Sequence, residues 1–175
     1  MGGLTREHIL RSLEALAAQL PADRSHTLVV VGGAALVLLY GARDATKDVD
    51  AFLLEPGSTE ALRRAAEAIA DTLDLPHDWL NDGAKGYLHG LTLGEHILTL
   101  PNLSVRAVAK EQLLAMKLSA WRDDVDIADA RLLLSRMTGS RNEIWGKVQA
   151  HLVPGRELKA EYAFDDLWGA LHETP

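Results

Sequence analysis

A glycine pair between two short apolar runs constrains the fold of this chain more than any other feature. Residues 27–31 are rich in β-branched side chains and are short enough for a buried strand. Gly32 and Gly33 interrupt that run, and residues 34–40 then have the pattern of a helix. Residues 48–54 have the pattern of a second strand. The sequence therefore predicts strand, glycine turn, helix and strand in succession.

Two carboxylates stand at the start of the second predicted strand. Asp48 and Asp50 are two residues apart, so in a strand their side chains point to the same face. Neighbouring carboxylates repel each other unless a cation lies between them, and Mg²⁺ prefers such oxygen ligands together with substrate phosphates. The alternative is a solvent-exposed edge strand, which an isolated Asp-x-Asp would favour.

The segment before the carboxylates strengthens the case for a site. Backbone N–H groups at the glycine turn and the positive end of the following helix suit an anion such as a triphosphate. Arg43 and Lys47 add positive charge between the glycine pair and the carboxylates. The combination is more specific than either the glycine pair or Asp-x-Asp alone.

The remainder of the chain predicts an α+β core followed by a helical part. Further strands are expected at residues 87–93 and 96–100, joined at Gly94 and Glu95, and at 103–105. Ser58 is expected to be the N-cap of a helix that extends to about residue 73. The other expected helices cover residues 4–20, 108–121, 125–137, 141–152 and 158–171. We therefore expect a mixed-sheet core over residues 1–106 and a helical C-terminal subdomain over residues 107–175.

Composition excludes several kinds of function. The 175 residues include no cysteine, so disulfides, thiolate metal sites and cysteine nucleophiles are excluded. The formal net charge of −7 argues against a broad non-specific nucleic-acid binder. The longest apolar stretch is broken by the glycine pair and is too short to span a bilayer. A cytoplasmic protein without membrane partners is expected.

These motifs resemble the nucleotidyltransferase signature of the DNA polymerase beta superfamily. The stretch from Arg43 through Thr46 to Asp48 and Asp50 is especially similar to AbiEii/MenT-type toxin nucleotidyltransferases and to a related uncharacterised bacterial family. The resemblance implies that Asp48 and Asp50 bind Mg²⁺ or Mn²⁺. It also implies that Gly32 and Gly33 contact the phosphates of a nucleoside triphosphate such as ATP. We further expect Arg43, Thr46, Lys47 and Lys85 to take part in binding this nucleotide.

The resemblance continues in the C-terminal part. Residues 114–127 are similar to a Lys-Leu-x-Ala…Arg-Asp-x-x-Asp-Leu pattern of the same proteins. The resemblance implies that Lys117 contacts the nucleotide and that Asp126 supports it, with Arg122 a weaker match. An ammonium group neutralises triphosphate charge, and a nearby carboxylate fixes its position. Without the first motif, Lys117 and Asp126 would be read as a solvated helix face.

The sequence differs from the family pattern in lacking a third carboxylate on a later strand. Many superfamily members carry a third carboxylate on a later strand, where it accepts the proton of the attacking hydroxyl. The strands expected at residues 96–100 and 103–105 contain no Asp or Glu, and neither Glu95 nor Asp82 fits the position. Either Asp126 supplies the third acid or catalysis is impaired.

A loop over residues 78–87 carries two aromatic side chains and a lysine. Trp79, Lys85 and Tyr87 suit stacking on a base with a phosphate contact, or else a packed loop around a buried Trp.

Three functions follow, and the first is the leading one. It is a metal-dependent nucleotidyltransferase acting on an acceptor hydroxyl of RNA, such as a tRNA 3′ end, or of a protein, as the toxin of a toxin–antitoxin pair with a cognate antitoxin. The second is a non-catalytic binding or regulatory protein with the same fold. The third is nucleotidylation of a small molecule, as in aminoglycoside-modifying relatives.

Overall fold

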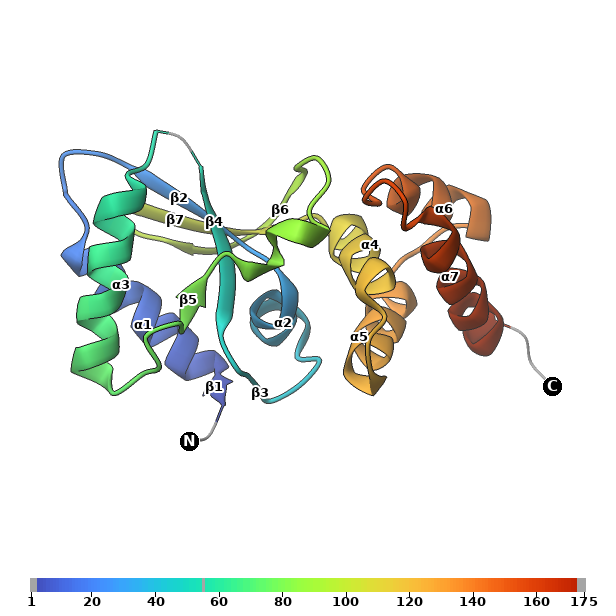
Figure 1. Cartoon of the computed structure of the whole chain (residues 1–175), viewed down its shortest axis with the longest axis horizontal. Helices are drawn as coiled ribbons and strands as arrows, with labels where there is room; N and C mark the ends of the chain where they lie inside the picture. The colour runs from blue at the N-terminus through green and yellow to red at the C-terminus, as the bar shows by residue number, and fades with distance from the viewer. Residues whose placement is uncertain (1–2, 55, 173–175) are drawn as a thin grey trace. The chain divides into compact units, whose positions relative to one another are not determined.

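A computed structural model describes residues 3–54 and 56–172 of the chain (Figure 1). The fold is α+β, as the sequence predicted. The chain forms two compact units, each considered by itself below. One comprises Met1–Ala84 and Leu93–Ala107, and the other comprises Lys85–Thr92 and Val108–Pro175.

The first unit is built on a mixed five-stranded sheet. The strand order is β5-β4-β2-β7-β6, and β2 pairs antiparallel with β4 and parallel with β7. β4 also pairs in parallel with the short strand β5. The strands are β2 (His26–Val30), β4 (Val49–Leu54), β5 (Leu80–Asn81), β6 (Leu93–Thr99) and β7 (Leu103–Val108).

Burial of the central strands explains why their sequences are so apolar. Leu28, Val29 and Val30 of β2 are inaccessible to solvent, and since successive side chains point to opposite faces, both faces of this strand are covered. The helices of this unit are α1 (Arg6–Gln19), α2 (Gly32–Ala35) and α3 (Thr59–Leu73), and α1 packs beside α3 (Figure 1). β1 (Leu4–Thr5) and β3 (Ala45–Thr46) form a separate antiparallel pair.

Local signals placed most of these elements correctly. The Ser58 hydroxyl accepts a hydrogen bond from the Ala61 N–H at 3.2 Å, which confirms the predicted N-cap of α3. Gly41 ends the helical segment with a φ of 58°, a left-handed conformation in which a Cβ is unfavourable. That segment differs from expectation in one respect, because Leu36–Tyr40 is a π-helical turn that continues α2.

Two expectations for the middle of the chain are wrong. Residues 87–93 do not form a strand, because Gly83–Tyr87 is a 3-10 helix (η2) and Gly90 adopts a φ of 65°. Gly94 and Glu95 do not separate two strands but lie inside β6. The Arg106 guanidinium on the neighbouring strand donates to the Gly94 carbonyl at 2.7 Å, so this glycine is held in the sheet.

The C-terminal part of the chain, which belongs to the second unit, is helical, as predicted. It contains α4 (Lys110–Ala120), α5 (Asp124–Ser135), α6 (Arg141–Gln149) and α7 (Glu157–His172). Helix α4 is buried from Gln112 to Ala120 and packs against the other three, so it is the centre of this bundle. None of the described helices is long and apolar enough to cross a membrane.

Candidate functional site

The glycine turn is the first part of the candidate site. Gly32 begins α2 with a φ of 59°, which L side chains rarely adopt. A Cβ on Gly33 would collide with the Thr46 hydroxyl and lie 3.0 Å from the Arg43 guanidinium. Val31, the N-cap residue, offers no side-chain hydrogen bond to the first turn. The turn therefore needs both glycines, and it lies directly against Arg43 and Thr46.

Asp50 lies against the same turn. A Cβ on Gly32 would be 3.3 Å from the Asp50 Oδ2 atom, and the Asp50 Oδ1 atom accepts a hydrogen bond from the Ala84 N–H at 3.2 Å. The side chain is half-buried in the second position of β4. The predicted meeting of the glycine turn and an aspartate is thus present at Asp50.

Asp48 precedes β4 instead of lying inside it, so the predicted strand begins one residue late. Its Oδ2 atom accepts a hydrogen bond from the Asn81 side-chain amide at 3.2 Å. Asn81 also receives the Gly83 N–H on its Oδ1 atom at 2.8 Å. Asn81 was not predicted as a site residue, although the turn-forming sequence Asn81-Asp82-Gly83 was a signal that could have found it.

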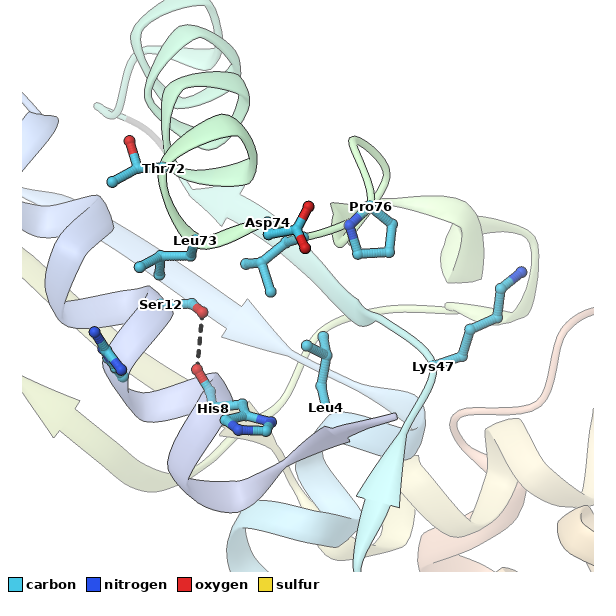
Figure 2. A pocket seen from close by; sticks show the side chains of 10 residues that line it. Leu4, His8, Ser12, Lys47, Thr72, Leu73, Asp74 and Pro76 are labelled. Carbon is cyan, nitrogen blue, oxygen red and sulfur yellow. Dashed lines mark hydrogen bonds between the residues drawn. The ribbon is translucent and has the colours of Figure 1, made fainter. Parts of the chain in front are cut away.

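The other residues predicted around the nucleotide are distributed differently. Thr46 is buried and Arg43 half-buried against the glycine turn, whereas Lys47 is exposed and lines a pocket between α1 and the end of α3 (Figure 2). Lys85 is exposed and belongs to the second unit. Of these four, the structure brings Arg43 and Thr46 to the glycine turn.

The two aromatic residues of the 78–87 loop, Trp79 and Tyr87, both contact other parts of the protein. Trp79 is fully buried, and its indole N–H donates to the Ala66 carbonyl at 3.0 Å, so Trp79 belongs to the core. The Tyr87 ring lies 4.8 Å from the Arg156 guanidinium carbon and 5.8 Å from that of Arg122, within cation–π range.

The second predicted constellation forms a buried ionic cluster between α4 and α5. The Lys117 ammonium lies 2.8 Å from Asp126 and 2.7 Å from Asp129. The backbone N–H and the guanidinium of Arg122 donate to the other Asp126 oxygen at 3.1 and 3.0 Å. Lys117 and Asp126 are therefore in contact, as predicted. Asp129 was missed, although its position one turn after Asp126 could have indicated it.

The electrostatics of Asp126 limit its chemistry. Burial on its own raises the pKa of this carboxyl, but hydrogen bonds from Arg122 and Lys117 outweigh burial and lower the pKa to about 2. Both oxygens already accept hydrogen bonds. An ionised, fully engaged carboxylate is suited to holding cations and is a weak proton acceptor near neutral pH.

No third carboxylate joins the candidate site from the later strands. Within the described β6 and β7, Glu95 is the one acidic side chain, and it is exposed. No group of three or more His, Asp or Glu residues in the described part of the chain is arranged to hold a metal ion.

In the first unit, a glycine turn follows β2, and Asp50 of β4 lies against that turn. This arrangement is the one that the resemblance to nucleotidyltransferases implies. A family model described as "Nucleotidyltransferase of unknown function (DUF6036)" matches residues 8–135, which is more than half of the chain. The chain belongs to that family. No curated protein and no solved structure matches it.

Proposed function

We propose that this protein transfers a nucleotidyl group from a nucleoside triphosphate to an acceptor hydroxyl of RNA, such as a tRNA 3′ end, or of a protein. The acceptor oxygen forms a bond to the α-phosphorus, and the bond between that phosphorus and pyrophosphate breaks. The hydroxyl proton passes to a base. The family description supports this class of reaction, while the acceptor and the metal are our proposal.

The observation that carries the proposal is the contact between the glycine turn and Asp50. The backbone of Gly32 lies beside the Asp50 carboxylate, and Gly33 lies against the side chains of Thr46 and Arg43. Phosphate oxygens suit N–H groups at a helix start, a hydroxyl and a guanidinium. A carboxylate in the same place repels phosphate unless a cation joins the two.

The donor set fits a divalent cation such as Mg²⁺ or Mn²⁺. Asp48 and Asp50 are half-buried hard oxygen donors, and Mg²⁺ is usually bound by one or two carboxylates plus substrate phosphates. When bound, such a cation activates an attacking oxygen and stabilises a leaving pyrophosphate. The Asn81 amide and the Ala84 N–H restrain one oxygen of each carboxylate and so keep both side chains oriented.

Lys117 and Asp126 enter the proposal through the family resemblance. The resemblance implies that Lys117 binds the nucleotide, and within the second unit Asp126 and Asp129 hold the Lys117 ammonium at 2.8 and 2.7 Å. We assign Asp126 no role as base, because its pKa is about 2 and its oxygens are occupied.

The resemblance to AbiEii/MenT-type toxins supports the biological setting of the proposal. In that setting the protein is a bacterial, cytoplasmic toxin, and a cognate antitoxin is its protein partner. The net charge of −7 favours a protein or a small molecule over a long RNA as the acceptor.

A second candidate function is nucleotide binding without transfer, in a regulatory or antitoxin-like protein. The observation in its favour is the composition of β7, the central strand beside β2. Ser104 and Arg106 take the half-exposed positions there, and the described residues of β7 include no carboxylate that could accept a proton.

One experiment separates the two. The protein is incubated with each α-³²P-labelled triphosphate, Mg²⁺, total tRNA and cell extract, and label transfer is followed on gels. For an enzyme, transfer is lost in Asp48→Ala and Asp50→Ala but persists in Asp44→Ala, a matched control in the same segment with an exposed side chain. Triphosphate binding by calorimetry without transfer would favour the second function. Absence of both transfer and binding would rule out both functions.

A further inference from the structure

The pocket lined by Lys47 lies in the first unit, between α1 and the end of α3 (Figure 2). Its volume is about 520 Å³, within the range of small-molecule sites. We propose that this pocket binds a small organic anion with an apolar body. This proposal does not rest on the proposed transferase function.

The charges around the pocket favour an anion. Arg11 of α1 and Lys47 both line it and are exposed. Neither forms an ion pair with any carboxylate in residues 3–54 and 56–172. This is notable in a chain with 25 acidic and 18 basic side chains, where a carboxylate partner is easily found. Asp74 is the one carboxylate among the described lining residues.

The lining also offers apolar surface. Leu4, which is 5% exposed, contributes to the walls together with Leu73 at the end of α3 and with Pro76 (Figure 2). Leu75, just after α3, also lines the pocket. The Ser12 hydroxyl donates to the His8 carbonyl at 2.8 Å, so it is already engaged within α1. The lining therefore combines the cations Arg11 and Lys47 with apolar surface, while Asp74, His8, Ser12 and Thr72 are its other polar residues. A cationic and apolar lining suits an amphipathic anion better than a bare ion.

The pocket is linked to the glycine turn through the β1–β3 pair. Leu4 pairs across the β1–β3 ladder with Thr46, and the Thr46 hydroxyl faces Gly33. Lys47 directly precedes Asp48 in the chain. A ligand held by Leu4 and Lys47 therefore contacts the two segments that position Thr46 and Asp48.

The test is a titration of the ¹⁵N-labelled full chain with phenyl phosphate, followed by amide chemical shifts. Saturable shifts are expected at Arg11, Thr72 and Asp74. Arg11→Ala and Lys47→Ala should each weaken binding about fivefold, and Asp74→Asn should tighten it, because each change alters one charge beside the ligand. Arg131→Ala removes an exposed arginine in the second unit and is the matched control, with no change expected.

Two companion ligands complete the test. Phenylacetate in place of phenyl phosphate shows whether the pocket prefers a carboxylate or a phosphate. Benzyl alcohol lacks the charge and should bind more weakly than either. The proposal is overturned if no saturable shift occurs at these residues, if benzyl alcohol binds equally well, or if Arg131→Ala weakens binding as much as Arg11→Ala. A separate titration with a triphosphate and Mg²⁺ follows the amide shifts of Gly32 and Gly33. Absence of shifts at these two glycines counts against the transferase proposal alone.

Discussion

Gly33 and Thr46 approach so closely that a Cβ atom on Gly33 would overlap the Thr46 hydroxyl oxygen. Thr46 is buried and paired with Leu4, so its side chain has little freedom to retreat. This contact joins the turn after β2 to the segment that leads into β4. It explains why the position demands glycine, independently of any ligand.

Replacement of Gly33 by alanine should therefore destabilise the first unit. Overpacking of this kind costs about 1–3 kcal/mol, measured as the free energy of unfolding in urea. The matched control is Gly146→Ala in α6, where a Cβ would meet nothing within 4 Å. That change should raise the free energy of unfolding by about 0.5–1 kcal/mol, because alanine is more favourable than glycine inside a helix. Equal effects of the two substitutions would contradict the close contact.

Asp126 should make stability depend on pH in acid. Its folded-state pKa of about 2 is below the ordinary value of 3.8, so the folded state favours the ionised form. The stabilisation is present above pH 4 and is lost as the pH falls from about 4 to 2. Asp126→Asn should lower the free energy of unfolding by about 2 kcal/mol at pH 7.

The difference in free energy of unfolding between wild type and Asp126→Asn should shrink as the pH falls, because the wild-type carboxylate itself becomes protonated. Urea unfolding of both proteins at pH 7, 4, 3 and 2.5 measures the difference. Asp124→Asn, at an exposed position of the same helix, serves as the control. A difference between wild type and Asp126→Asn that stays constant from pH 7 to 2.5 would show that the ionic cluster is not its source.

Gln112 should hold the segment that follows η2. This fully buried side chain donates to the carbonyls of Gly90 and His89 at 2.9 and 3.3 Å and accepts the Thr92 N–H at 2.9 Å. Gln112→Met keeps the volume but removes all three hydrogen bonds, at a cost of about 1–3 kcal/mol.

Hydrogen exchange provides the measurement. The Thr92 amide should exchange faster in Gln112→Met, whereas Gln149→Met, at an exposed position in α6, should leave it unchanged. Unaltered protection of Thr92 in Gln112→Met would count against this anchoring role.

His26 should be replaceable with a gain in stability. It is fully buried at the start of β2, and neither ring nitrogen has a hydrogen-bond partner among the described residues. A buried polar group without a partner costs about 1–3 kcal/mol. His26→Leu should therefore raise the melting temperature by about 2–4 °C per kcal/mol recovered. His8→Leu, at an exposed position in α1, is the control, and a fall in melting temperature specific to His26→Leu would refute the expectation.

Features encoded over a few neighbouring residues were predictable. The Ser58 cap, the left-handed Gly41 and the helices of the second unit depend on local propensity and hydrophobic period. Residues 87–93 were predicted wrongly because their conformation depends on Gln112, which lies 20 residues or more along the chain. Their alternating pattern carried no sign of this long-range anchor.

The sequence by itself determined the α+β class, the glycine turn and the carboxylates that follow it, because residue type and spacing encode these locally. Only the tertiary structure decided which side chains meet. Pairing of β4 with β5 brings Asn81 to Asp48, and packing of α5 on α4 puts Asp129 beside Lys117. Tertiary packing likewise directs Lys47 to the pocket beside α1, whereas Arg43 and Thr46 lie at the glycine turn. Such contacts arise because strand pairing and helix packing join residues far apart in the chain, and no local pattern specifies them.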